Sequence, residues 1–347
     1  MKIVLNVSLV YLKNEFNRKI EVDDNIKLTD LCEYIIVSLN GNCKHVYDLE
    51  MNNGENYLSY IPYNDDIDGT LMNDLRLCDI GINKDSYFAL YYGDENSALW
   101  KFDIYVDSMS NDKTDIDFKV IDGKGVGIID DINNSIYFYD LFDENIPDKN
   151  KGYIIERIKG YDEWNNSKFT VESNNEKIDE YKRKQIRLCM PKNYILNVTL
   201  DGFGSLIKRK ISVDGDISLS DLCRGIILSM NGDLSHLYTI KRNKDYLDTG
   251  IVMGRNLNFL DFKEKQRFVV VYDYGDNWHF KVTVSKIKDG YGNKKFEVLK
   301  AVGRGIEDDC GGTWGLARLI DDPDNDWGYD INDYSLDEIN ETVEKYL

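Results

Sequence analysis

The chain carries one pattern twice, and this internal duplication constrains its fold more than any other feature. Residues 5–47 align without a gap with residues 196–238. The similarity resumes downstream, where FKVIDGKGVGIIDD (118–131) matches FEVLKAVGRGIEDD (296–309). A pattern repeated at this length predicts two copies of one structural unit.

The repeat also sets the domain boundaries. FTVESNNEKIDEY, at the end of the first copy, recurs as YSLDEINETVEKY at the end of the second. We predict a first domain over 1–185, a linker over 186–193 around Pro191, and a second domain over 194–347. Two copies in one chain can pack together as an internal pseudo-dimer, which predicts a monomer or a weak homo-oligomer.

Each copy opens with a strand pair followed by a helix. In the second copy, ILNVTL and IKRKISV alternate as strands do and are separated by a glycine-containing turn. Apolar residues then recur at helical spacing over 28–39 and over 219–230. Thr29 and Ser220 are predicted to cap these helices, and the Asn-Gly pair after each run is predicted to end them.

Further strands and helices complete each copy. The apolar run 267–273 predicts a central strand, and the alternation that starts at Trp278 predicts a half-buried one. Another strand is expected over 296–302, with helices near 314–321 and 336–346. We therefore predict an α+β fold, with two tandem copies of a β-grasp-like core (hairpin, helix, further antiparallel strands) and added C-terminal helices.

The charge of the chain limits the kinds of partner that it is expected to bind. The net charge of −19 disfavours direct binding to DNA, RNA or an anionic membrane. Residues 306–347 hold thirteen acidic residues against Arg318 and Lys345. Such a run is usually a solvated face, and the alternative is a surface for a basic partner or one that imitates nucleic acid.

The cysteines and the first residues of the chain indicate the cellular compartment in which the protein is expected. The six cysteines (32, 43, 78, 189, 223 and 310) include no Cys-x-x-Cys pair, which predicts a reducing, cytoplasmic location without disulfides or structural zinc. Cys32 and Cys223 are expected to pack in the core. No apolar run is long enough to span a membrane. The opening MKIVLNVSLVYL recurs inside the chain, so we interpret it as domain structure rather than a signal peptide.

The densest group of polar and aromatic residues is YDYGDNW (272–278). Residues 274–277 are predicted to form a hairpin turn in which Gly275 supplies the positive φ. A turn does not explain Asp273, beside a run of valines, or Trp278. We expect these two residues to brace the turn against a glycine-rich loop, GRGIEDDCGGTWG (303–315).

The glycine-rich loop completes the predicted site. Paired glycines before a helix can present N–H groups to an anion, but the acids in front of them disfavour phosphate. Asp309 or Thr313 is expected to cap the helix. The predicted binding residues are Asp273, Tyr274, Asp276, Trp278, Asp308, Asp309, Cys310, Gly311, Gly312 and Trp314.

Two chemical alternatives arise from the same segments. A divalent-metal-dependent hydrolase or nuclease would hold Mg²⁺ or Ca²⁺ with oxygen ligands from Asp273, Asp276, Glu307, Asp308 and Asp309. Acidic turns outnumber metal sites, so we predict no cofactor and assign no catalytic residue.

Cysteine and histidine residues supply the second alternative. Cys310, His279 and Asp308 could form a nucleophilic group, but no sequence spacing brings them together. His45 and His236, at matching positions after the helices, are predicted to pack or to hydrogen-bond.

The motifs YDYGDNW, EDDCGGTWGLARLIDDPDND and YDINDYSLDEIN together resemble the plasmid pRiA4b ORF-3-like family, whose members occur on mobile elements. The resemblance covers about 194–342 and includes IKRKI (207–211) and SHLY (235–238). The first copy departs from it, because DINNSIYF (131–138) replaces DCGGTWG and residues are gained before Trp100. The resemblance implies a mobile-element accessory protein and no particular activity.

A binding function needs fewer assumptions than either enzymatic alternative. Aromatic residues that anchor protein interfaces cluster near the predicted site, namely Tyr272, Tyr274, Trp278, Trp314 and Trp327. We predict a non-enzymatic, mobile-element-associated protein that acts on a basic or nucleic-acid-handling protein through an acidic, aromatic-lined surface. Its role would be regulation or counter-defence inhibition. A resolvase is disfavoured because the chain has no basic DNA-binding segment.

Overall fold

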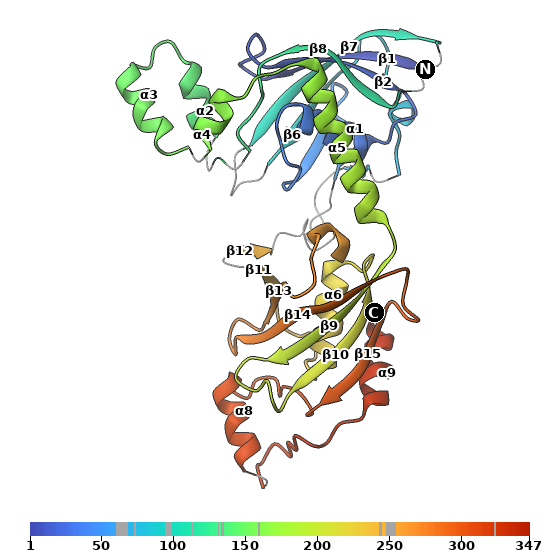
Figure 1. Cartoon of the computed structure of the whole chain (residues 1–347), viewed down its shortest axis with the longest axis vertical. Helices are drawn as coiled ribbons and strands as arrows, with labels where there is room; N and C mark the ends of the chain where they lie inside the picture. Colours follow the sequence, from blue (N-terminus) through green and yellow to red (C-terminus); the bar gives the residue numbers. More distant parts are fainter. Residues whose placement is uncertain are drawn as a thin grey trace. The chain divides into compact units, whose positions relative to one another are not determined.

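The computed structural model describes two compact units, Met1–Lys184 and Gln185–Leu347 (Figure 1). It describes all residues except 60–68, 73, 94–98, 113, 115, 131, 133–134, 159, 243–244, 248–254 and 323. Residues 94–98, which include those gained before Trp100, are therefore not described. The same holds for Asp131 in the altered loop. Among those described, no helix combines the length and apolarity needed to cross a membrane.

The first unit is an eight-stranded sheet with helices. Its elements are β1 (Lys2–Leu9), β2 (Asn17–Asp23), α1 (Leu28–Ser38), β3 (Tyr47–Met51), β4 (Asn56–Leu58), β5 (Thr70–Leu71), the 3₁₀ helix η1 (Leu77–Ile80), β6 (Tyr87–Tyr92), β7 (Trp100–Ser110), β8 (Phe118–Lys124), α2 (Ser135–Phe142), α3 (Asp148–Ile155), α4 (Tyr161–Asn166) and α5 (Val171–Cys189). The strand order is β5-β4-β3-β6-β7-β1-β2-β8.

The second unit repeats this plan. Its elements are β9 (Lys192–Leu200), β10 (Lys208–Asp214), α6 (Leu219–Ser229), β11 (Tyr238–Arg242), β12 (Asp245–Leu247), the 3₁₀ helix η2 (Leu257–Leu260), β13 (Arg267–Tyr272), β14 (Trp278–Asp289), β15 (Phe296–Val302), α8 (Gly312–Asp321) and α9 (Leu336–Tyr346). The order β12-β11-β13-β14-β9-β10-β15 is antiparallel at every pairing. The α+β class and the interior position of β13 are confirmed.

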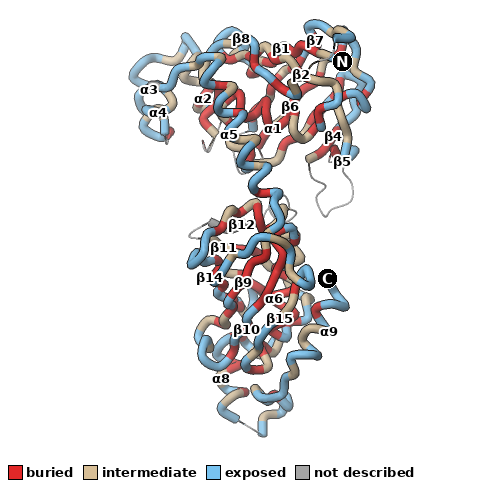
Figure 2. Tube along the Cα trace, turned by 45° about the vertical axis from the view of Figure 1, so that its right-hand side comes forward, coloured by how far each residue is buried: buried red, intermediate tan, exposed pale blue. Residues whose placement is uncertain are grey.

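The core of each unit lies between its sheet and its first helix. Figure 2 shows buried residues concentrated along the central strands and along α1 or α6. The helical face predicted from the apolar spacing is the buried one, and Cys32 and Cys223 lie fully inside it. These thiols are packing residues, as the sequence predicts.

The helices begin and end where the apolar spacing predicts, to within one residue, but the predicted N-cap residues are wrong. Asn40 and Asn231 follow the helices with φ of 72° and 70°, which stops helical pairing. The N-cap of α6 is Ser218, whose Oγ accepts from the Asp221 N–H at 2.9 Å, and that of α1 is Lys27, which makes no side-chain cap. Ser218 and Lys27 are both extended and form β-bridges, with Asn256 and Arg76 respectively, and Thr29 and Ser220 fall inside the first turns.

A buried arginine ties the elements of each unit together. Arg209 is 2% exposed and donates from Nε to the Ser229 carbonyl at the end of α6 (2.6 Å). Its other nitrogens donate to the carbonyls of Lys208 (3.0 Å), Val302 (2.9 Å) and Arg304 (2.8 Å). Burial lowers the pKa of Arg209 to about 10. Arg18 makes the equivalent four bonds in the first unit.

Replacing Arg209 with methionine is expected to destabilise the second unit by about 3–5 kcal/mol, because several inward-facing carbonyls lose their donor. Denaturant unfolding measures this change. The control is Lys210→Met on the exposed face of the same strand, expected to change stability by at most about 0.5 kcal/mol. Equal effects of the two substitutions would contradict the role given to Arg209.

Candidate metal centre

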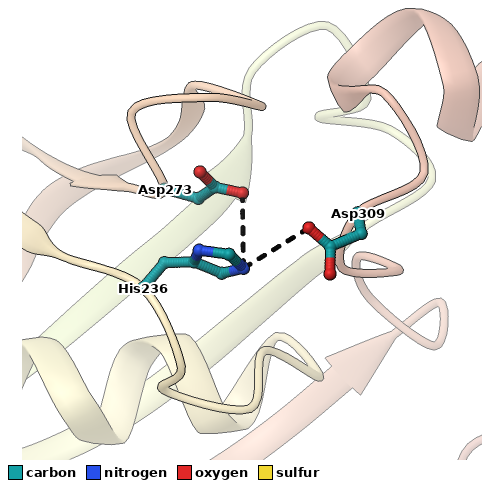
Figure 3. Close-up of side chains that lie close together, drawn as sticks. All are labelled: His236, Asp273 and Asp309. Carbon is teal, nitrogen blue, oxygen red and sulfur yellow. Dashed lines mark ion pairs between the residues drawn. The ribbon is translucent and has the colours of Figure 1, made fainter.

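Three segments of the second unit meet at one end of its sheet. His236 lies just before β11, Asp273 directly follows β13, and Asp309 lies in the loop between β15 and α8 (Figure 3). The Asp273 N–H donates to the Leu237 carbonyl at 3.0 Å, which continues the β11–β13 pairing by one residue. Sheet register therefore sets Leu237 opposite Asp273, and the neighbouring His236 lies close to the Asp273 carboxylate.

One nitrogen of His236 faces two carboxylates. Its Nε2 lies 3.7 Å from Asp273 Oδ2 and 3.6 Å from Asp309 Oδ1 (Figure 3). Both separations exceed hydrogen-bonding distance, and this buried Nε2 has no hydrogen-bond partner among the described residues. The three ligand atoms lie within 4.8 Å of one another. Ligands held about 2.1 Å from a common ion stand roughly 3.0–3.5 Å apart, so a small closure of this group would fit a metal.

The three side chains differ in exposure. The Asp273 side chain is 8% exposed, and its second oxygen, Oδ1, accepts from the Gly275 N–H at 2.8 Å. The Asp309 side chain is 77% exposed. The His236 ring packs edge-on against Tyr272, with centroids 5.9 Å apart. The group thus has a fixed inner side and an outer side open to solvent, an arrangement that leaves room for water or substrate on a bound ion.

The other predicted oxygen ligands make contacts outside this group, although Asp308 Oδ1 and Glu307 Oε2 have no hydrogen-bond partner in the described structure. Asp276 Oδ2 accepts from the Gly311 N–H at 3.3 Å, and Glu307 pairs with Arg304 at 3.4 Å. Asp308 Oδ2 accepts from the Asp233 N–H at 2.9 Å. Burial raises the pKa of Asp308 to about 6, although that hydrogen bond favours its ionised form. Of the five acids, only Asp273 and Asp309 face a common point within the described structure.

From the sequence, His236 is predicted to pack or to hydrogen-bond rather than to act as a ligand, and the structure places it in the group that could hold a metal. The ring does pack against Tyr272, but its free nitrogen points at the carboxylates. The signal was present in SHLY, because this motif immediately precedes the strand that pairs with the one before Asp273. Only the register of β11 on β13 turns that proximity into a contact.

The turn differs from the predicted one. Asp273 and Asn277 carry the positive φ, at 54° and 55°, and Gly275 does not. The reason is the bond from the Gly275 N–H to the Asp273 carboxylate, which folds the turn around that side chain. Trp278 is fully buried in the core, and Asp276 makes a hydrogen bond to the glycine-rich loop.

The remaining predicted site residues divide into exposed and structural ones. Tyr274 and Trp314 are 54% and 72% exposed, whereas Tyr272 is buried like Trp278 and cannot anchor a partner. The N-cap of α8 is Gly311, with φ of 92° and no side-chain cap, so the expected caps Asp309 and Thr313 are wrong. A glycine at this position adopts the left-handed conformation without strain.

Cys310 and its expected partners have separate contacts. Cys310 Sγ lies 3.7 Å from the Gly312 carbonyl, and His279 Nε2 lies 3.1 Å from Asn277 Oδ1. Burial, with the charges of Asp276 and Glu307, raises the pKa of Cys310 to about 11. These contacts give no support to a cysteine nucleophile.

The first copy carries a natural change at this site. Its Tyr47–Tyr92 pair matches Tyr238–Tyr272, and the Gly93 N–H donates to the Val46 carbonyl at 2.9 Å just as that of Asp273 does to Leu237. Gly93 therefore takes the place of Asp273 in the first unit. His45 keeps its contact with the Tyr92 ring, at 5.7 Å.

Cys310 is expected to alkylate slowly, because a thiol with a pKa near 11 is only roughly 0.1% thiolate at pH 8. Iodoacetamide labelling followed by peptide mass spectrometry measures the rate, with the exposed Cys189 as the internal control. The Cys310 rate should rise about tenfold per pH unit up to pH 11. Faster labelling of Cys310 than of Cys189 at pH 8 would contradict this.

Parts of this chain are similar to known proteins. An "Uncharacterized protein y4hQ" of Sinorhizobium fredii (strain NBRC 101917 / NGR234) is 27% identical over 137 residues, covering 36% of this chain and 70% of that protein. The crystal structure of "Protein of Unknown Function MM3350 from Methanosarcina mazei Go1" aligns with a TM-score of 0.37 at 21% identity, over 43% of this chain and 98% of that one. The family model "Plasmid pRiA4b ORF-3-like protein" matches residues 2–177 and again 192–345, so the resemblance extends to the first copy. The chain belongs to the plasmid pRiA4b ORF-3-like family and contains its domain twice.

Proposed function

We propose that the second copy binds a divalent transition-metal ion through His236, Asp273 and Asp309 and uses it in a hydrolytic reaction. The observation that supports this proposal is the buried His236 Nε2, which has no hydrogen-bond partner in the described residues and faces two carboxylates. An unpaired buried polar atom costs free energy, and a metal ion would remove that cost. The proposal places metal chemistry ahead of the purely protein-binding role that the sequence favours.

The donor set bears on the identity of the ion. Mg²⁺ and Ca²⁺ prefer oxygen ligands alone, whereas imidazole with carboxylates suits Zn²⁺, Mn²⁺ or Fe²⁺. The inclusion of His236 therefore favours a transition metal over the Mg²⁺ or Ca²⁺ considered from the sequence. Three protein ligands leave coordination positions for water, and a metal lowers the pKa of bound water enough to make it a nucleophile near neutral pH.

A titration with Mn²⁺ or Zn²⁺ is expected to stabilise the protein saturably, by about 2.7 kcal/mol at a hundredfold excess over Kd. Asp273→Gly, which copies the first unit, should abolish the effect, because it removes the buried ligand. Calorimetry and thermal unfolding measure both quantities. The control is Asp216→Asn, an exposed carboxylate on the β10–α6 connection. Equal stabilisation of Asp273→Gly and the unmodified protein would refute the metal centre.

Metal-dependent hydrolysis is tested with chromogenic phosphodiester and carboxylic ester substrates and with DNA. Turnover should require Mn²⁺ or Zn²⁺ and should fall at least about a hundredfold in Asp309→Ala, because the open side of the ion then loses a ligand. The unmodified chain treated with a chelator and then resupplied with metal is the control. Metal binding without turnover on any of these substrates would limit the role of the ion to structure.

A separate observation supports protein binding as a second function. Trp314 and Trp327 are 72% and 52% exposed, and they flank a run of exposed carboxylates in the segment after α8. Exposed tryptophans are interface anchors, and the surrounding charge suits a basic partner. We propose that this surface docks a basic or nucleic-acid-handling protein as a mobile-element regulator or counter-defence inhibitor that imitates nucleic acid. The six free cysteines support a cytoplasmic setting.

For the docking surface, the probe is a lysine-rich peptide that carries one aromatic residue. Trp314→Ala with Trp327→Ala should weaken its binding about tenfold or more at fixed salt, because the aromatic anchors are lost. Fluorescence anisotropy measures the affinity. The exposed Tyr291, changed to alanine, is the control. Binding that depends on salt but not on the tryptophans would contradict a specific docking surface.

Two finer structural proposals accompany these functions. The relationship of each unit to β-grasp domains is supported by a β-hairpin followed by a helix that covers the sheet. A pseudo-dimer of the two units within one chain is supported by their shared plan. Light scattering during size-exclusion chromatography addresses the predicted monomer.

A further inference from the structure

Two ligands of the proposed metal centre are held by the sheet, and the third is not. His236 and Asp273 flank the paired strands β11 and β13, which fix their separation. Asp309 lies in a loop, and its side chain is 77% exposed. The distance from Asp309 to Asp273 therefore depends on what holds this loop on each side.

The segment before Asp309 is anchored in the same way in both copies. The Ile306 N–H donates to the Met230 carbonyl at 2.7 Å, and the Asp308 carboxylate accepts from the Asp233 N–H at 2.9 Å. In the first unit Ile128 bonds to Leu39 at 2.8 Å, and Asp130 accepts from the Asn42 N–H. This anchor is shared by the copy that has the buried carboxylate and the copy that lacks it.

The segment after Asp309 is anchored to the turn that carries Asp273. The Gly311 N–H donates to Asp276 Oδ2 at 3.3 Å. Gly312, with φ of 68°, lies so close to this turn that an added Cβ would stand 2.5 Å from the Asp276 carbonyl oxygen. In the sequence of the first copy, Asn133 and Asn134 occupy the positions of the two glycines. In sequence, the first copy therefore lacks both the glycine pair and, at Gly93, the buried carboxylate.

We infer that Asp276 and Gly312 are positioning residues for the metal centre. Asp276 ties the turn to the loop by accepting the Gly311 N–H, and Gly312 lets the two backbones meet. Together they hold Asp309 opposite His236 and Asp273 without contacting the ion. The inference rests on the proposed metal function. It gives the turn at 274–277 and the glycine pair at 311–312 a common role, which is to position Asp309.

The first test separates the hydrogen bond of Asp276 from its charge. Asp276→Ala removes the acceptor and should raise the Kd for Mn²⁺ by about 10- to 100-fold, the usual effect of losing a residue that orients a ligand. Asp276→Asn keeps an acceptor oxygen and should bind Mn²⁺ nearly as well as the unmodified protein. Calorimetry gives the affinities. The visible spectrum of bound Co²⁺ at saturation reports whether the coordination geometry has changed.

The second test separates close packing from backbone strain. Gly312→Ala combines a positive φ with the clash against Asp276, whereas Gly328→Ala has a similar φ of 63° and no atom within 4 Å of its Cβ. Gly312→Ala should weaken Mn²⁺ binding at least tenfold, and Gly328→Ala should leave it unchanged. Thermal unfolding of the metal-free variants shows that each remains folded.

The outcomes are distinct. Weak Mn²⁺ binding and an altered Co²⁺ spectrum in Asp276→Ala, with rescue by Asp276→Asn, support the inference. Unchanged affinity in both Asp276→Ala and Gly312→Ala overturns it while leaving the metal centre intact. Equal losses in Asp276→Ala and Asp276→Asn overturn it too, because charge would then be the cause. Failure of the unmodified protein to bind either ion refutes the proposed function and this inference together.

Discussion

In each unit, a buried arginine at the end of the first helix links that helix to a strand and a loop that are distant in the sequence. In the second unit Arg209 bonds to the end of α6, to the end of β15 and to the loop that follows. A cation at a helix C-terminus is favourable, and the dense set of acceptors offsets the cost of burying its charge. The loop toward Asp309 therefore starts from a fixed point, since the Arg304 carbonyl is one of these acceptors.

The two copies show that this framework can be kept while the site is lost. Arg18 repeats the bonds of Arg209, and His45 repeats the ring contact of His236. The change falls where the backbone has positive φ, at Gly93 (119°) and Asp273 (54°). Glycine occupies such a position without strain, whereas an aspartate there is strained and needs local support. Asp273 is buried and has a strained backbone, and such strain is often found at functional sites.

Much of the fold could be predicted because its signals are local. Apolar spacing identified the helices that cover the sheets, and the continuous apolar run identified β13 as an interior strand. The N-caps of the helices were predicted wrongly: the N-cap of α6 is Ser218, which also forms a bridge to Asn256, thirty-eight residues away in the chain. The proposed metal centre combines Asp273 and Asp309, which the sequence offered as oxygen ligands, with His236, which was predicted to pack or to hydrogen-bond.

The sequence alone determined the duplication, the α+β class and the segments that carry the proposed metal centre. Repeats and hydrophobic periodicity can be recognised directly in the order of the residues. Only the tertiary structure decided which acids converge. The register of β11 on β13 sets His236 beside Asp273, and backbone N–H groups hold Asp276 and Asp308 away from that point. The reason is physical: a carboxylate's direction follows from the φ of its own residue and from the donors that folding brings near it, and neither is visible in composition or spacing.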